Sequence, residues 1–251
     1  MLTHPLFDQL KTLRCQGMLE ALQEQLLMAD INRLSFDERF GLLLERECIL
    51  RDSRRLTNRL RQARLKIVDA CLEDVDYQSS RGLSKMVLNR LSQCQWVSRK
   101  ENVLITGPTG IGKTYLGCAF ANQACRQGFS ARYVRLPKLL QTIVIAKGDG
   151  TYIKMMELLA KTSLLILDDW GVAPMTDCNR RDLLELMDDR YNQSSTIITS
   201  QLPVSLWHES IGDATLGDAI LDRLVHNAHR IELAGDSMRK TRTKKSDEEK
   251  E

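Results

Sequence analysis

The sequence has 251 residues, of which 43% are hydrophobic and 27% charged, and its net charge is +3. These values are ordinary for a globular protein, and no apolar run approaches the ~18 residues of a membrane span. No signal peptide opens the chain, and the 7 cysteines are scattered without a C-x-x-C pair. We therefore expect no membrane partner, zinc site or disulfide framework, and we expect reduced thiols in a cytoplasm.

The N-terminal third predicts helices. Leucines near helical spacing predict an amphipathic helix over residues 5–30. Ser35-Phe-Asp-Glu38 has the spacing of a capping box, which predicts the start of a second helix that continues to about Leu65. A short third helix is expected from Ser84 to Leu91. The first half of the second helix carries an apolar stripe, which comprises Phe36, Phe40, Leu43, Leu44 and Ile49.

Basic side chains crowd the second half of that helix, where Asp52 alone opposes them. They are Arg51, Arg54, Arg55, Arg59, Arg61, Arg64 and Lys66. Arg51, Arg55 and Arg59 share one helix face, where each like-charge pair costs ~0.2–0.5 kcal/mol. DNA phosphates would neutralise this row, and the lack of interleaved aromatic residues favours the backbone of a duplex over stacking on single strands. The alternative is a solvated face that is salt-bridged to acidic residues elsewhere.

A glycine-rich loop follows the apolar run Val103–Thr106 and precedes a helical segment. In this context the pattern G-x-x-x-x-G-K-[ST] predicts a phosphate-binding loop rather than a plain glycine-rich turn, because backbone N–H groups and the helix N-terminus face the phosphates. Lys113 is expected to reach the β- and γ-phosphates, and the Thr114 hydroxyl to ligate Mg²⁺. The predicted nucleotide-binding residues are Gly107, Pro108, Thr109, Gly110, Ile111, Gly112, Lys113, Thr114 and Tyr115.

Strands and helices alternate after the loop. We expect strands at 131–136, 164–169, 196–201 and 229–233, helices at 137–146 and 152–160, and a turn at 147–150. The strand at 164–169 runs from apolar residues into two carboxylates. At the carboxyl edge of a parallel sheet, Asp168 would hold hydrated Mg²⁺, and Asp169 would orient or deprotonate the attacking water.

This alternation predicts an α/β fold, a P-loop ATPase with a parallel five-stranded sheet between helices, preceded by a small all-α domain. We expect a helical domain for DNA binding or oligomerisation over residues 1–95 and an ATPase domain over 96–235. Residues 236–251 are expected to form a charged, disordered tail.

The whole chain resembles the IstB-type helper ATPases of insertion-sequence transposons, relatives of the DnaC-type helicase loaders in the AAA+ superfamily. The resemblance covers essentially the full length and is carried by Gly107–Thr114, Leu164–Gly171 and four shorter motifs. Those motifs are Arg99-Lys-Glu-Asn102, Thr199-Ser-Gln-Leu-Pro203, Leu221-Asp-Arg-Leu224 and Gly235-Asp-Ser-Met-Arg239.

The resemblance implies roles for further side chains. Gln201 stands at the sensor-1 position, where many relatives carry Asn, and would contact the γ-phosphate or the lytic water. Arg223 matches the arginine finger that reaches the ATP of a neighbouring subunit, although a surface ion pair with Asp222 or Asp218 is the alternative. Arg239 matches a second arginine that senses the nucleotide. The family often has Glu where this chain has Asp169, and a carboxylate with roughly 1.5 Å less reach predicts slow or DNA-stimulated hydrolysis.

The basic helix and this resemblance together predict a slow, nucleoid-associated ATPase of the bacterial cytoplasm that uses ATP and Mg²⁺. It would assemble as a homo-oligomer on duplex DNA, without sequence specificity, and assist the transposase of the same element in target selection. A DnaC-like loader of a replicative helicase is the alternative. A nucleotide kinase is disfavoured, since no acceptor-binding or lid insertion is evident.

Overall fold

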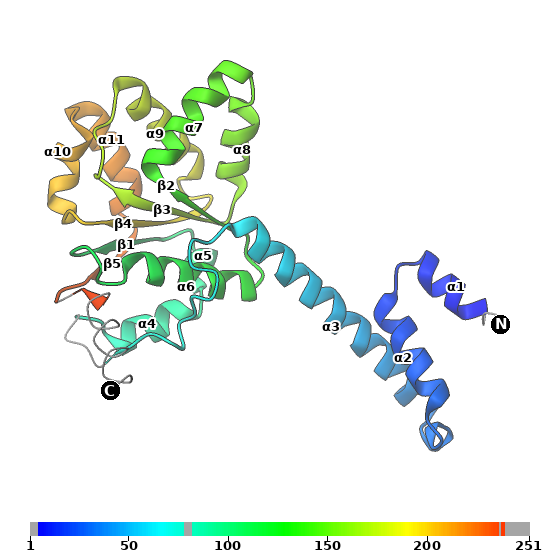
Figure 1. Ribbon diagram of the computed structural model, residues 1–251. Coiled ribbons are helices and arrows are strands. Elements are labelled where there is room, and N and C mark those ends of the chain that lie inside the picture. The colour runs from blue at the N-terminus through cyan, green and yellow to red at the C-terminus, as the bar shows by residue number, and fades with distance from the viewer. Residues whose placement is uncertain (1–4, 78–81, 236, 239–251) are drawn as a thin grey trace, which may run out of the picture. The chain divides into compact units, whose positions relative to one another are not determined.

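The computed structural model describes residues 5–77, 82–235 and 237–238. The chain divides into two compact units, Met1–Asn58 and Arg59–Glu251, whose elements are labelled in Figure 1. Residues 59–95 thus cluster with the sheet, whereas the functional boundary expected at 95/96 stays a prediction. No helix in the described ranges is long and apolar enough to cross a membrane.

The N-terminal unit is helical, but the prediction of a single helix over residues 5–30 is wrong. This segment forms two helices, α1 (Pro5–Thr12) and α2 (Gln16–Leu27). The 3₁₀ turn η1 (Ile31–Arg33) and the long helix α3 (Phe36–Ala63) follow. The break comes at Arg14, whose φ of 56° lets the Cys15 N–H close the end of α1 on the Leu10 carbonyl, at 2.9 Å. Leucine spacing alone does not reveal this turn.

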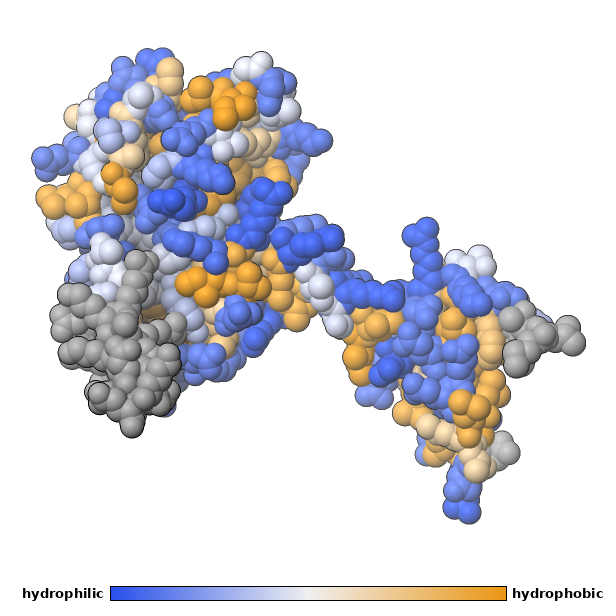
Figure 2. Space-filling view, viewed as in Figure 1, coloured by the Kyte–Doolittle hydropathy of each residue, from blue (hydrophilic) through white to orange (hydrophobic). Residues whose placement is uncertain are grey.

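The capping box at the start of α3 is confirmed. The Ser35 N–H and hydroxyl donate to the Glu38 carboxylate at 2.7 and 2.8 Å, and the Glu38 N–H donates to the Ser35 hydroxyl at 3.3 Å. The helix also ends close to the predicted Leu65. Its apolar stripe, however, is largely exposed in the N-terminal unit, with Phe36 69% exposed, and Figure 2 shows apolar side chains on the surface of this unit.

Helices α2 and α3 are joined through Gly17 and Glu47. A Cβ atom on Gly17 would lie 2.7 Å from the Cα atom of Glu47, so the close approach of the two backbones requires glycine. The Glu47 carboxylate, only 7% exposed as a residue, accepts the Gly17 N–H at 2.6 Å and the Met18 N–H at 3.1 Å. Arg51 donates to the same carboxylate at 2.6 Å. A buried charge thus satisfies N–H groups that the first turn of α2 leaves unpaired.

We expect Glu47→Gln to weaken the packing of α2 on α3 by about 1–3 kcal/mol, because the buried N–H groups would lose a charged acceptor. Burial opposes ionisation of Glu47, but the hydrogen bonds from Arg51, Met18 and Gly17 outweigh it and lower its pKa. The carboxylate therefore stabilises the fold above the unfolded glutamate pKa of about 4.3, and this contribution is lost as pH falls through the lower folded value.

Hydrogen exchange of the α2 amides in the full chain measures this effect at neutral and acidic pH. Glu45→Gln is the matched control, because Glu45 is exposed on the same helix. Equal protection of α2 in both variants at neutral pH would contradict the role given to Glu47.

The second unit is built on a five-stranded parallel sheet in the order β2-β3-β4-β1-β5. The strands are β1 (Asn102–Thr106), β2 (Ala131–Arg135), β3 (Leu164–Trp170), β4 (Ser195–Ser200) and β5 (Ala228–Glu232). They confirm the α/β fold and the strands expected from the sequence. Since β1, β3 and β4 are central and covered on both faces, nearly all their residues are buried.

Helices cover both faces of the sheet (Figure 1). One face carries α6 (Lys113–Arg126) with α4 (Lys85–Ser92) and α5 (Gln95–Ser98), and Gly117 of α6 lies against Ile166 and Ile197. The other face carries α7 (Leu136–Asp149), α8 (Tyr152–Lys161), α9 (Asp177–Arg190), the 3₁₀ turn η2 (Val204–Leu206), α10 (Trp207–Ile211) and α11 (Ala214–Val225). A hydrophobic core lies on that side, and it includes Leu165, Leu167 and Ile198.

The prediction of a turn at 147–150 is wrong because the turn begins later in the chain. Helix α7 continues to Asp149, and Gly150 ends it with a φ of 77°. The sequence Lys147-Gly-Asp-Gly150 contains two glycines, and the first is accommodated inside the helix. The C-cap conformation requires glycine only at the second.

Candidate nucleotide-binding site

A cleft of about 280 Å³ opens at the carboxyl edge of the sheet. It lies where β1, β3 and β4 end, as expected for ligands of open α/β sheets. Nine of the residues predicted for the nucleotide site line it, namely Thr109, Gly110, Gly112, Lys113, Thr114, Tyr115, Asp168, Asp169 and Gln201. The structure therefore brings the phosphate loop, both carboxylates and Gln201 together in one chain.

The phosphate loop has the backbone that its glycines predict. Gly107 has a φ of 144°, and a Cβ atom there would lie 2.3 Å from the Leu233 carbonyl oxygen at the end of β5. Gly112, with a φ of 104°, is the N-cap of α6. The Met238 N–H donates to the Gly110 carbonyl at 3.0 Å, which ties the loop to the chain beyond β5. The open end of α6 thus faces the cleft with its positive pole.

Lys113 is the first residue of α6, and its ammonium curls back over the loop. Nζ donates to the carbonyls of Gly107 and Pro108 at 2.6 and 2.7 Å. Burial lowers the pKa of this ammonium, and the charges of Asp168 and Asp169 oppose that shift. The side chain is therefore positioned as a cation between the phosphate loop and the two carboxylates.

Asp168 is 1% exposed and is the most enclosed carboxylate of the site. It accepts hydrogen bonds from Thr114 at 3.0 Å, from Tyr133 at 2.5 Å and from Thr199. Burial, followed by the hydrogen bond to Asp168, raises the pKa of the Tyr133 hydroxyl, so it remains a proton donor. Three donors from α6, β2 and β4 thus hold the carboxylate in place.

The donor set at Asp168 fits Mg²⁺. A carboxylate and the Thr114 hydroxyl lie side by side at the mouth of the phosphate loop, and both are hard oxygen ligands. Mg²⁺ in nucleotide sites takes one or two protein oxygens and fills the remaining positions with phosphate oxygens and water. Thr114 and Asp168 would supply those protein oxygens.

Asp169 adopts a left-handed backbone, with a φ of 66°, where the register of β3 on β4 shifts between Leu167 and Trp170. Its carboxylate accepts from Arg135 Nε at 2.6 Å. This hydrogen bond and the attraction between the charges raise the pKa of the Arg135 guanidinium. Arg135 ends β2, beside β3, so the adjacent strands explain the pair, which the sequence analysis missed.

Gln201 follows β4 and contacts the phosphate loop directly. Its side-chain oxygen accepts from the Thr109 hydroxyl at 2.7 Å. The amide therefore lies beside the loop that is predicted to hold the phosphates. Its role as sensor 1 stays a prediction.

A segment that the sequence analysis did not assign to the site also lines the cleft. Residues Lys66, Ile67, Asp74, Val75 and Asp76 follow α3 and lie beside Tyr115 and Leu116 of α6. The Tyr115 hydroxyl anchors the segment by donating to the Cys71 carbonyl at 3.1 Å. Its apolar side chains, Ile67 and Val75, give the cleft a surface that suits a flat base.

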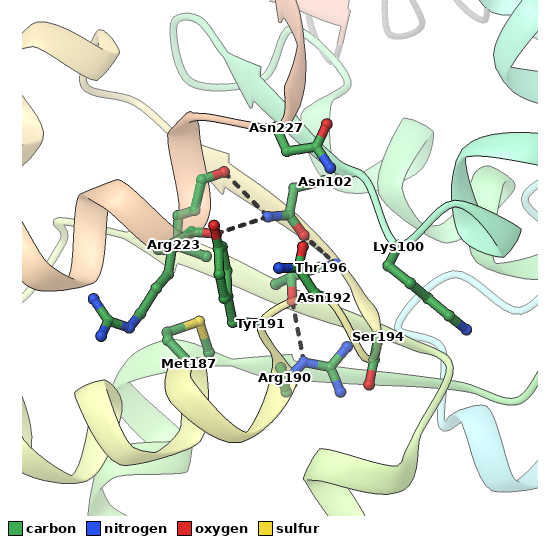
Figure 3. Close-up of a pocket in the computed structure, with 11 residues that line it drawn as sticks. Lys100, Asn102, Met187, Arg190, Tyr191, Asn192, Ser194, Thr196, Arg223 and Asn227 are labelled. Carbon is green, nitrogen blue, oxygen red and sulfur yellow. Dashed lines mark hydrogen bonds between the residues drawn. The ribbon is translucent and has the colours of Figure 1, made fainter.

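Arg223 lies outside this cleft, on α11. Its guanidinium pairs with Asp188 of α9 and donates to the Ala219 carbonyl at 2.7 Å. Figure 3 shows it at a second, smaller hollow, where the guanidinium points away from Asn102. The Asn102 amide donates to the carbonyls of Arg223 and Leu224, both at 3.2 Å, and so holds the end of α11. Arg223 thus forms an ion pair, as the alternative predicted, but its partner is Asp188 rather than Asp222 or Asp218.

Some side chains of the basic run are already paired within the protein. Arg51 pairs with Glu47 at 2.6 Å and Arg55 with Asp52 at 3.3 Å, so two members have the salt bridges of the alternative interpretation. Arg59 donates to the Cys125 carbonyl at 3.3 Å. Arg54, Arg61 and Arg64 are exposed, while Lys66 lines the cleft. Contact of these residues with DNA stays a prediction. Arg239 and, apart from Ser237 and Met238, the predicted tail lie outside the described residues.

A phosphate loop after β1 and paired carboxylates at the end of β3, in a parallel sheet of order β2-β3-β4-β1-β5, define a P-loop nucleotide-binding fold of the AAA+ type. The model of the family described as IstB-like ATP binding protein matches residues 8–246. The chain belongs to this family.

Individual proteins agree with this assignment. An insertion sequence ATP-binding protein of Sinorhizobium fredii is 48% identical over 246 residues, which cover 98% of this chain and 100% of the relative. Among solved structures, DnaI has a TM-score of 0.58 at 22% identity over 70% of this chain and 93% of its own. The DnaC helicase loader has a TM-score of 0.55 at 19% identity over 65% of this chain and 96% of its own. At these identities the two structures show a shared fold.

Proposed function

We propose that this chain is an ATP-dependent, sequence-nonspecific duplex-DNA-binding ATPase that assembles on DNA and helps a transposase select its target. The observation that carries the proposal is the cleft in which Lys113, Thr114, Asp168 and Asp169 converge. The basic side chains of α3 and the membership of a family named from insertion sequences support the DNA and transposase parts.

Each side chain of the cleft has a proposed task. Lys113 binds the β- and γ-phosphates, and Thr114 and Asp168 hold Mg²⁺, which neutralises phosphate charge. Asp169 orients or deprotonates the attacking water, with Gln201 beside it. Ile67, Val75 and Leu116 contact the base. ATP and Mg²⁺ are thus the proposed cofactors, and the reaction is hydrolysis to ADP and phosphate.

Arg223 is proposed to complete the site of a neighbouring subunit. It lines a different hollow from the cleft of its own chain and lies at the end of a helix that Asn102 holds in place. An arginine finger supplied in trans would make hydrolysis depend on a homo-oligomer, since charge stabilisation in each site then needs two chains.

The DNA-binding proposal is tested by duplex binding over a salt series, with and without ATP. We expect Arg54→Gln combined with Arg55→Gln to flatten the plot of log affinity against log salt by about two units, because each lost phosphate contact removes about 0.9. Arg33→Gln is the matched control, since Arg33 and Arg55 each pair with an aspartate three residues earlier in the chain, Asp30 and Asp52.

Duplex-DNA binding of equal affinity with and without ATP would contradict this function. So would an unchanged salt dependence of DNA affinity in the double variant. The helicase-loader alternative is separated by capture from a cell lysate that contains both partners. Recovery of the transposase supports the proposal, and recovery of a replicative helicase alone supports the loader.

A further inference from the structure

Lys66 lies in the nucleotide cleft, although its place at the end of the basic run predicts a DNA contact. Its Nζ atom is 3.8 Å from Oδ2 of Asp168. It lines the same cleft as Lys113 and Thr114. The side chain is 46% exposed, whereas that of its partner is 1% exposed. A lysine directed at a buried carboxylate belongs to the environment of that carboxylate, not to the open face of a helix.

The backbone around Lys66 fixes this position. Helix α3 ends at Ala63, and Arg64 turns the chain with a φ of 49°. Leu65 and Ala70 are buried on either side. The backbone of Lys66 and Ile67 also contacts the Cys118 thiol of α6. The segment is therefore anchored on α6, the helix that begins at the phosphate loop, and it delivers the lysine to the edge of the loop.

The pairing with Asp168 leaves Lys66 able to serve another anion. Asp168 already accepts from Thr114, Tyr133 and Thr199, and a separation of 3.8 Å exceeds hydrogen-bond distance. The interaction is an ion pair without a hydrogen bond. Lys66 and Mg²⁺ would carry charges of the same sign beside one carboxylate. Asp74, Asp76 and Asp169 line the same cleft, and further negative charge beside the ammonium would stabilise it more. A bound phosphate chain supplies that charge.

We propose that Lys66 binds the phosphate chain of the nucleotide, as a second lysine of the site beside Lys113. This inference rests on the proposed ATP site. It assigns Lys66 to the nucleoside triphosphate rather than to DNA. The residue three positions beyond the end of the basic helix thereby becomes part of the nucleotide-binding surface.

Equilibrium binding of fluorescent ATP, ADP and AMP to the full chain tests the proposal. Lys66→Met removes the charge and keeps much of the length, and we expect it to weaken ATP binding about tenfold while AMP binding changes less than twofold. Lys66→Arg should retain most of the affinity for ATP. Lys161→Met is the matched control, because Lys161 also pairs with a carboxylate, that of Glu157, but lies on α8 outside the cleft.

An ATP affinity of Lys66→Met that equals or exceeds that of the unaltered chain would overturn the proposal and make Lys66 a simple counterion of Asp168. A flatter salt dependence of DNA binding without nucleotide, at unchanged ATP affinity, would overturn it in favour of a DNA contact. The controls separate the two levels of inference. If the unaltered chain does not bind ATP, the proposed function itself is refuted. Loss of binding in Lys113→Ala but not in Lys66→Met removes only the role of Lys66.

Discussion

Lys113→Ala is expected to weaken ATP binding by at least about 100-fold, because a half-buried site would lose its principal cation for the β- and γ-phosphates. The side chain lies between the phosphate loop and two carboxylates, and its charge offsets theirs. Without it, the phosphates would face Asp168 and Asp169 with less compensation. Titration calorimetry with ATP and Mg²⁺ measures the loss, and assembly on DNA should disappear with it.

Lys161→Ala is the control for Lys113, since it removes an exposed lysine elsewhere in the same unit. Lys113 also donates to the loop carbonyls of Gly107 and Pro108. Thermal unfolding therefore has to show that the variant keeps its fold. An ATP affinity within threefold of the unaltered chain, or an oligomer on DNA that still forms with ATP, would contradict the assignment of the phosphate loop.

Arg223→Ala is expected to leave ATP binding intact and to lower DNA-stimulated hydrolysis by about 10³-fold, the lower end of the effect of arginine fingers. The reason is geometric, since Arg223 does not line the cleft of its own chain. Mixing Arg223→Ala subunits with Asp169→Asn subunits should restore part of the activity. In some mixed interfaces an intact finger then faces an intact carboxylate.

Asp188→Asn distinguishes this role from a structural one. Arg223 pairs with Asp188 in the structure, so Asp188→Asn weakens the same ion pair and keeps the arginine. Hydrolysis close to normal in Asp188→Asn supports the finger. An equal loss in both variants, or no recovery on mixing, would show that Arg223 acts through its ion pair on α9.

The phosphate loop and the second strand with carboxylates were predictable because each is a local pattern. Gly107–Thr114 and Leu164–Asp169 carry their geometry in consecutive residues, and a parallel sheet brings strand ends to one edge. The capping box at Ser35 is local in the same way. The structure confirms the loop between β1 and α6, the strand that ends in two carboxylates and the capping box, and the first two account for most of the cleft.

The partners of the carboxylates were not predictable, because their signal is tertiary. Tyr133 and Arg135 are ordinary residues of a strand until β2 pairs with β3 and places them beside Asp168 and Asp169. Lys66 belongs to a basic run by sequence and to the cleft by its fold. Arg190 would be read as a surface charge, yet it is 2% exposed and donates to the Leu159 carbonyl at 2.5 Å and the Thr162 carbonyl at 2.9 Å.

Two errors in the helices have a different cause. Hydrophobic spacing predicted one helix over 5–30, but a left-handed residue at Arg14 costs little next to the hydrogen bonds that cap α1. The glycine before Asp149 suggested a turn, yet a single glycine inside a helix costs only about 1 kcal/mol, which the packing of α7 outweighs. In both places tertiary contacts and end-capping overrode the local preference.

The left-handed backbone at position 169 explains why an aspartate, rather than the longer glutamate, stands there. Aspartate, with its short polar side chain, occupies this region several times more often than most residues with a Cβ atom, and glutamate has no comparable preference. A position with a φ of 66° at a register shift in the strand therefore favours the residue found here. The loss of reach toward a water molecule is offset by a backbone that holds the carboxylate in one place. In an oligomer of the proposed kind, this shorter reach would slow hydrolysis and lengthen the lifetime of the assembly.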